Sequence, residues 1–243
     1  MFYSIREDIR AVKERDPAAP SAVGVLVNYP GLHAVAAHRC ENYLWKHGRR
    51  GLARFMSQCT RFFTGVEIHP GATLGRRVFI DHGMGVIIGE TAVVGNNVTI
   101  FQGVTLGGTG KQTGKRHPNI GDWATLGVGA AVLGNVTVGE NSKVGAGAVV
   151  VDHVPANSTV VGIPGRIVSQ DGIRVCPADL SRREPLPYPL EEDLLALTKR
   201  VEELENQGIQ GMDNNQLAGI LKRLDALEAE INTLDAAIKN LST

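Results

Sequence analysis

An aliphatic residue recurs every six positions through the middle of this chain, and this period constrains the fold more than any other feature. The residues are Ile68, Leu74, Ile80, Val86, Ile88, Val94, Ile100, Leu106, Ile120, Leu126, Val132, Val138, Val144 and Val150. Neither the period of a helix nor the alternation of a simple strand produces so strict a period of six. The repeat predicts a chain wound into stacked coils, each short strand turning one aliphatic side chain inward. Three hexads form one triangular coil of about 18 residues.

The period breaks at two places. After Val86 the register moves by two residues to Ile88, and eight extra residues separate Leu106 from Ile120. The second break is rich in glycine, lysine and arginine and contains one histidine. Because function concentrates in loops that leave a rigid scaffold, we expect the functional site near these two breaks.

The pattern predicts an α+β protein with four segments. Residues 1–64 have apolar residues at helical spacing and predict an N-terminal helical region, and residues 65–168 form the repeat. Prolines mark residues 169–190 as a linker. In residues 191–243, leucine and isoleucine recur at steps of three and four, which is coiled-coil spacing. This extension is expected to self-associate or to form a helical hairpin, with an amphipathic helix folded onto the body as the alternative.

Within the helical region, prolines after Asp16 mark a break, and two apolar-periodic stretches follow at about residues 21–29 and 31–62. The chain has three cysteines, scattered and without any C-x-x-C spacing. They predict reduced, buried thiols rather than disulfides or a zinc site.

Composition excludes several classes of protein. The chain has 25 basic and 25 acidic residues, and 43% of its residues are hydrophobic, as in globular proteins. No apolar run approaches the ~20 residues of a membrane span, and the N-terminus lacks the features of a signal peptide. We therefore expect a cytoplasmic protein that binds neither membranes nor nucleic acid, since the basic surplus of its body is diffuse.

Five short motifs identify a family resemblance. They are Asp81-His82-Gly83, Gly89-Glu90-Thr91-Ala92, the glycine-rich run from Gly103 to Gly110, Lys115-Arg116-His117-Pro118 and Gly162-Ile163-Pro164-Gly165-Arg166. With the hexapeptide repeat, they resemble the serine O-acetyltransferase family of hexapeptide-repeat acyltransferases. The resemblance implies a left-handed parallel β-helix, assembly as a trimer or a dimer of trimers, and acetyl transfer from acetyl-CoA to the hydroxyl of L-serine. The products are O-acetyl-L-serine, used in cysteine biosynthesis, and CoA; another hydroxyl acceptor is the alternative.

The transfer requires a base with a pKa near neutrality, because a serine hydroxyl is a weak nucleophile. His82 is the candidate base. A carboxylate that orients the imidazole completes such a dyad, and Glu67 stands where the family commonly has aspartate.

An amino-acid acceptor also has two charged ends. Arg116 and His117 suit its carboxylate through charge-assisted hydrogen bonds, whereas Asp81, Glu90 and Asp16 suit its ammonium group. For Asp16, which precedes a proline, an ordinary turn or helix-start role is equally compatible with the sequence.

The resemblance also implies residues for the thioester and for coenzyme A. An oxyanion requires backbone N–H donors, which Gly108 and Thr109 would supply. By motif position, the family's coenzyme A groove falls on Gly127, Val128, Ala146 and Arg166. Glycine and alanine at these places are also what the corners of a repeat need.

Two other functional classes compete. A metal-dependent hydratase on the same fold needs three converging histidines, but no third histidine stands near His82 and His117 at fitting spacing, so no metal is expected. A pure assembly scaffold would explain the heptads but not the polar motifs. The resemblance also implies cysteine synthase as a partner, whereas the ending Leu241-Ser242-Thr243 departs from the isoleucine that family members often insert into that enzyme.

Overall fold

The computed structural model describes residues 2–19, 21–110 and 113–175, together with residue 199 and residues 222–223. The helices and strands given below belong to one unit, Met1–Leu180, and Ser181–Thr243 form a second unit. Apart from the three isolated positions, the heptad-patterned extension and most of the predicted linker lie outside the described residues.

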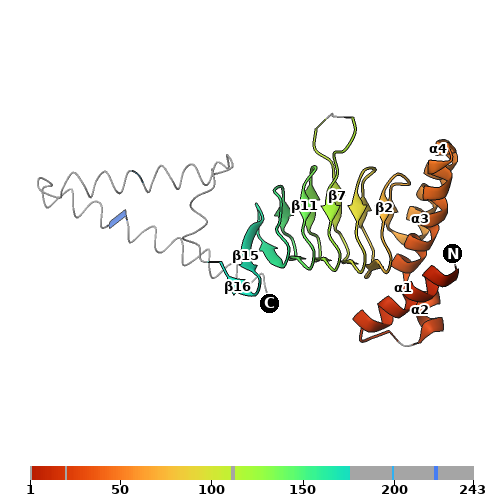
Figure 1. Ribbon diagram of the computed structural model, residues 1–243, viewed down its shortest axis with the longest axis horizontal. Coiled ribbons are helices and arrows are strands. Elements are labelled where there is room, and N and C mark those ends of the chain that lie inside the picture. The colour runs from red at the N-terminus through yellow and green to blue at the C-terminus, as the bar shows by residue number, and fades with distance from the viewer. Residues whose placement is uncertain (1, 20, 111–112, 176–198, 200–221, 224–243) are drawn as a thin grey trace, which may run out of the picture. The chain divides into compact units, whose positions relative to one another are not determined.

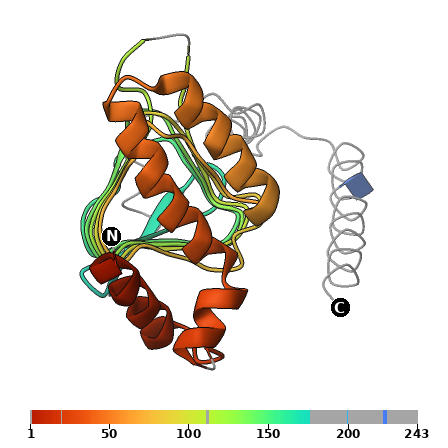
Figure 2. The ribbon, with the colours of Figure 1, turned by 90° about the vertical axis from the view of Figure 1, so that its right-hand side faces the viewer.

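Four helices open the chain: α1 (Phe2–Arg15), α2 (Ala22–Asn28), α3 (Pro30–Lys46) and α4 (Arg50–Thr64). The expected single stretch over 31–62 is wrong, because two helices separated by a turn occupy it. Gly48 supplies the left-handed conformation in that turn, at φ 78°, as glycine does where helices end. Gly65, at φ 72°, ends α4 in the same way. Both views in Figures 1 and 2 show these helices at one end of the stacked strands.

Short strands follow, mostly two or three residues long. They are β1 (Glu67–Ile68), β2 (Thr73–Leu74), β3 (Phe79–Ile80), β4 (Ile87–Ile88), β5 (Val93–Val94), β6 (Thr99–Ile100), β7 (Thr105–Gly107), β8 (Asn119–Ile120), β9 (Thr125–Leu126), β10 (Ala131–Leu133), β11 (Thr137–Val138), β12 (Lys143–Val144), β13 (Val149–Val150), β14 (Ser158–Val161), β15 (Arg166–Gln170) and β16 (Ile173–Arg174). The strands continue to Arg174, beyond the predicted limit of residue 168. The last two are antiparallel and therefore do not follow the hexad pattern.

The strands form three sheets that the chain visits in turn. The first sheet has the order β1-β4-β7-β10-β13, the second β11-β8-β5-β2, and the third β16-β15-β14-β12-β9-β6-β3. The pairing is parallel from β1 to β14. Seen along the stack, the coils superpose as a triangle (Figure 2). The predicted coils with parallel strands are therefore present.

The core contains the repeated aliphatic residues. All of the hexad positions are buried except Leu74, which is partly exposed and still packs against the core. Leu74 lies in the first coil, whose strands β1 and β3 pack against α3. Each fully buried aliphatic side chain contributes roughly 1.5–3 kcal/mol through removal from water, so the stack carries most of the stability of the β region.

Two edges of the triangular stack matter for function. The His82 edge comprises the turns from the third sheet to the first, namely residues 81–86, 101–104, 127–130 and 145–148. The loop edge comprises the turns from the first sheet to the second, namely residues 69–72, 89–92, 108–118 and 134–136. Part of the chain between β7 and β8 stands away from the coils (Figure 1), whereas His117 and Pro118 at its end are buried.

The first register break lies on the His82 edge. Six residues, 81–86, join β3 to β4, whereas four residues, 101–104, join β6 to β7 one coil later. Val86 is buried but belongs to this turn and not to a strand. The two extra residues therefore bulge the chain at His82.

Two further findings concern the helices. Cys59 on α4 is exposed, so the expectation of buried thiols is wrong for it; Cys40 is partly buried. In the described part of the chain, no helix combines the length and the apolarity needed to cross a bilayer.

Candidate active site

His82 has an unusual backbone conformation. Its φ is 59°, in the left-handed region that residues other than glycine seldom adopt. Gly83 and Gly85, also at positive φ, complete the wide turn. The side chain is 73% exposed, and its Nε2 lies 3.9 Å from Oδ1 of Asp81. His82 therefore presents an exposed imidazole beside a carboxylate.

Asp16 lies near the same turn, just after the end of α1. Its Oδ1 accepts a hydrogen bond of 2.8 Å from the backbone N–H of Ala18, and its Oδ2 accepts one from the Tyr29 hydroxyl. This bond raises the pKa of Tyr29 to about 12, and the nearby charge of Asp81 acts in the same direction. Asp16 therefore caps a turn and also belongs to an acidic group with Asp81, so both roles considered for it are compatible with the structure.

A close helix-to-strand contact brings this group together. A Cβ at Gly31, in the first turn of α3, would lie 2.0 Å from the carbonyl oxygen of Ile80. Only glycine permits α3 to begin so close to the end of β3. As a result Tyr29, which precedes α3, lies beside Asp81, which follows β3.

On the loop edge, Arg116 and Glu90 form an ion pair. Nη2 of Arg116 lies 2.6 Å from Oε2 of Glu90. This hydrogen bond holds the pKa of Glu90 below its ordinary value. The two residues predicted to bind opposite ends of an amino acid are thus paired with each other in this structure.

His117 is buried against the same edge. Its Nδ1 accepts a hydrogen bond of 3.2 Å from the backbone N–H of Thr91. A ring nitrogen that accepts from an amide is unprotonated, so Nε2 carries the proton of the neutral ring. Burial, followed by the charge of Arg116, lowers the pKa of His117. His117 is thereby set up as a neutral hydrogen-bond donor.

Glycines make room for this ring. A Cβ at Gly89 would lie 2.0 Å from Cδ2 of His117, and a Cβ at Gly108 would lie 3.1 Å from its Nε2. Gly108 therefore lies beside His117 on the loop edge, and Thr109 follows it on the same edge. Three of the predicted coenzyme A residues, Gly127, Val128 and Ala146, lie instead on the His82 edge.

Glu67, predicted to orient His82, has a different partner. Its Oε2 lies 2.9 Å from Nη1 of Arg61 on α4. Among the contacts of the described residues, none joins Glu67 to His82. Arg166, the last predicted coenzyme A residue, begins β15 and pairs with Val161 at the end of the third sheet.

The predicted site residues therefore form two groups. Asp16, Asp81 and His82 lie at one edge of the first sheet, and Glu90, Arg116 and His117 lie at the other. One face of the triangle, about five residues at about 3.3 Å each, separates the edges by roughly 15 Å. Across residues 2–19, 21–110 and 113–175, no cluster of three or more histidine, cysteine, aspartate or glutamate side chains is arranged to hold a metal ion.

Comparisons with known proteins agree with the motifs. The family model "Serine acetyltransferase, N-terminal" matches residues 1–37. A serine acetyltransferase of Bacillus subtilis (strain 168) is 57% identical over 204 residues, which cover 84% of this chain and 93% of the relative. The chain belongs to the serine acetyltransferase family.

Solved structures of this family have the same fold. Serine acetyltransferase of Neisseria gonorrhoeae in complex with serine is 45% identical, with a TM-score of 0.67 over 69% of each chain. The Brucella abortus strain S19 enzyme in complex with coenzyme A is 44% identical, with a TM-score of 0.68 over 71% of this chain and 69% of that one. The predicted class, an acyltransferase with acetyl-CoA as its co-substrate, is confirmed.

Sequence reasoning missed three residues that shape the site. Tyr29 holds Asp16, Thr91 fixes the tautomer of His117, and Arg61 pairs with Glu67. Thr91 stands inside a recognised motif, which is a usable signal. Tyr29 lies between α2 and α3 and Arg61 lies on α4, and the repeat does not reveal how these helices dock.

Proposed function

We propose that this protein transfers the acetyl group of acetyl-CoA to the hydroxyl of L-serine, giving O-acetyl-L-serine and CoA. The observation that carries the proposal is the position of His82, held exposed in a left-handed turn beside Asp81. Its family relatives, which are named serine acetyltransferases, support the choice of donor and acceptor.

In the proposed reaction, His82 removes the proton of the serine hydroxyl while the hydroxyl oxygen attacks the thioester carbon. The new C–O bond forms, the C–S bond breaks, and the CoA thiolate takes the proton from the imidazolium. A base near neutral pKa contributes about 10²–10⁴-fold to such a step. Glu67 is the proposed carboxylate that stabilises the imidazolium.

The acceptor is proposed to bind between the two groups of residues. The Nε2–H of His117 and the guanidinium of Arg116 fit its carboxylate, whereas Asp81 and Asp16 fit its ammonium group. Because Arg116 is already paired with Glu90, a zwitterion can replace both partners at once: its carboxylate meets Arg116 and its ammonium meets Glu90. A neutral sugar would leave these charges without new partners, which disfavours it as the acceptor.

The His82 edge fits the proposed binding of acetyl-CoA. A Cβ at Gly127 would lie 2.7 Å from the backbone nitrogen of Ala146, so this part of the edge is a shallow surface of backbone. Between it and His82 lies Gln102, whose Oε1 is buried without a hydrogen-bond partner in the described structure. An amide N–H of the pantetheine arm would satisfy this oxygen. Gly108 and Thr109 are the proposed donors to the thioester oxygen.

The distance between the two edges indicates how the site is completed. Groups roughly 15 Å apart on one chain cannot hold a molecule as small as serine, but the His82 edge of one copy can face the loop edge of the next. We therefore propose a trimer, or a dimer of trimers, of left-handed β-helices with its sites between subunits. A cytoplasmic location remains a prediction from the sequence.

The test is release of free thiol from acetyl-CoA with L-serine and with a panel of other hydroxyl acceptors. Turnover with serine is expected, and its absence would overturn the proposal. Preference for another acceptor would support the alternative hydroxyl acetyltransferase. His82→Ala is expected to abolish turnover with an unchanged unfolding temperature. His153→Ala, which removes an exposed histidine whose Nδ1 accepts from Thr137, serves as its control.

The heptad-patterned extension is proposed to add to the assembly. Because β15 and β16 extend to Arg174, a shortened chain should end after Val175 so that both strands remain. Light scattering should give a smaller assembly, after allowing for the shorter chain, than the full-length protein gives. An unchanged number of subunits would contradict this role.

A further inference from the structure

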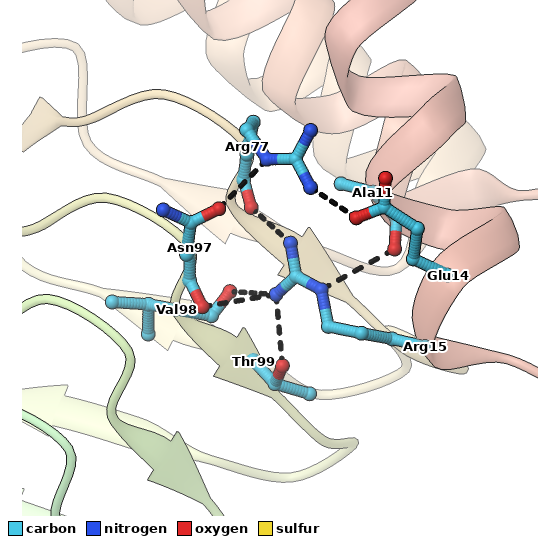
Figure 3. Close-up of polar contacts among 7 residues, drawn as sticks. All are labelled: Ala11, Glu14, Arg15, Arg77, Asn97, Val98 and Thr99. Atoms are coloured by element: carbon cyan, nitrogen blue, oxygen red, sulfur yellow. Dashed lines mark hydrogen bonds and ion pairs between the residues drawn. The ribbon is translucent and has the colours of Figure 1, made fainter.

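Arg15, the last residue of α1, forms several hydrogen bonds with the coils (Figure 3). Arg15 donates from Nη1 to two carbonyl oxygens and one hydroxyl, from Nη2 to a third carbonyl, and from Nε to a fourth. The acceptors are Asn97 O at 3.0 Å, Val98 O at 3.2 Å, Thr99 Oγ1 at 2.9 Å, Arg77 O and Ala11 O at 3.3 Å. Four of these five acceptors belong to the first two coils.

The surroundings of this guanidinium keep it in place. Burial, and then the charge of Arg77, lower the pKa of Arg15, whereas the charges of Glu14 and Asp8 act in the opposite direction. Arg77 is itself held by Asn97 at 2.7 Å and by Glu14. The Arg15 guanidinium also lies 5.7 Å from the ring centroid of Phe79. Lysine has its donors on a single atom and cannot reproduce this spread of hydrogen bonds.

The next residue in the chain is Asp16. Its N–H still donates to the carbonyl of Val12 at 2.8 Å, as in a continuing helix. The position of the Asp16 carboxylate therefore follows directly from the position of the last turn of α1. Tyr29, which holds Oδ2 of Asp16, packs against the cluster that contains Phe79. Arg15 and Tyr29 thus locate the carboxylate from two sides.

We propose that Arg15 is a positioning residue for the acetyl acceptor. By tying the end of α1 to the coils, it places Asp16 beside Asp81, where the ammonium group of the acceptor binds. This inference rests on the proposed function. Arg15 does not touch the acceptor, so its effect passes through Asp16.

Other contacts hold the rest of α1, which separates positioning from folding. Arg76 pairs with Glu7 at 2.8 Å, and Arg39 on α3 pairs with Asp8 at 2.6 Å. Loss of the Arg15 contacts should therefore leave α1 attached while its last turn moves. Arg76→Ala is the matched control, because it removes an arginine contact between α1 and the coils at a position away from Asp16.

The experiment compares steady-state kinetics of Arg15→Lys, Arg15→Ala and Arg76→Ala. Misplacing a binding group by about 1 Å can cost as much as 100-fold, so both Arg15 variants should raise the KM for serine by about 10- to 100-fold. The KM for acetyl-CoA should stay within about twofold, because Gly127, Val128 and Ala146 lie on later coils than the residues that Arg15 contacts. Arg76→Ala should change neither constant.

A double-mutant cycle with Asp16→Asn tests whether the effect passes through Asp16. If it does, adding Arg15→Lys to Asp16→Asn should raise the KM for serine no further. The proposal would be overturned if the effects of Arg15→Lys and Asp16→Asn on the KM for serine were fully additive. It would also be overturned if the Arg15 variants left the KM for serine unchanged, or raised the KM values for serine and acetyl-CoA equally. Failure of both Arg15 variants to fold would assign Arg15 a structural role and overturn it as well. A wild-type protein that is inactive with serine would remove the proposed function itself, and the inference with it.

Discussion

The separation of the two groups of site residues predicts complementation between inactive variants. His82→Ala removes the proposed base from one edge of the coils. His117→Ala removes, from the other edge, the proposed hydrogen-bond donor to the carboxylate of serine. Neither variant should be active alone. If each site takes His82 from one subunit and His117 from its neighbour, coexpression of the two variants should restore activity.

The expected yield follows from counting subunits. With equal amounts and random assembly, half of the subunits keep His82 and half keep His117. A site is intact only when a subunit of the first kind faces one of the second, so about one quarter of the sites are intact in a cyclic oligomer. If both histidines served a site within one chain, the mixture would have no intact site.

Thiol release from acetyl-CoA with saturating serine measures this fraction at equal total protein. Wild type coexpressed with the double variant is the matched control: about one quarter of the wild-type rate is expected for sites shared between subunits, and about one half for sites within a chain. The shared site would be refuted if the mixture of single variants had no activity above background and the control had about half of the wild-type rate.

Three further predictions test individual contacts. Gly89→Ala should lower activity at least about tenfold, because its Cβ would lie 2.0 Å from the His117 ring. Gly51→Ala is the control, because a Cβ at this position of α4 has open space. It should stabilise the protein by about 1 kcal/mol in urea unfolding. Burial lowers the pKa of His38 from 6.5 to about 4, so the folded state disfavours its protonation. The resulting stabilisation of about 3 kcal/mol is complete above pH 6.5 and is lost as the pH falls toward 4. His38→Gln should remove this part of the pH dependence of the free energy of unfolding in urea. An unchanged slope of that free energy against pH would contradict the role of His38. Arg61→Ala, which breaks the ion pair with the proposed dyad carboxylate, should leave kcat within about fivefold of wild type; a loss of 100-fold would show that the guanidinium itself is needed.

The sequence predicts the coils well because their physics is local and repeated. An aliphatic residue such as Ile100 or Leu106 must face inward whenever strands are six residues apart, and both are fully buried. The hexad count even separates the two groups of site residues, since the turn after Ile80 and the turn after Ile88 are successive corners. The motifs alone do not separate the two groups, because a motif identifies the chemistry of its residues but not the corner of the coil on which they lie.

The helices were less predictable, because their docking depends on contacts between distant residues. Gly31 permits α3 to approach Ile80, and nothing local to either residue indicates that they meet. The same holds for Tyr29 and Asp16, which α2 brings together from 13 positions apart. Patterns of six or seven residues cannot report such pairs.

The ion pair between Arg61 and Glu67 raises the question of whether the proposed dyad can form. The two side chains are 54% and 23% exposed, and exposed pairs of this kind contribute only about 0–1 kcal/mol. Releasing Glu67 from Arg61 would thus reduce the competent fraction by at most about fivefold. A positioned base contributes about 10²–10⁴-fold to proton transfer, which outweighs that cost. Glutamate is one methylene longer than the aspartate common in the family, and in this structure its carboxylate contacts Arg61 of α4.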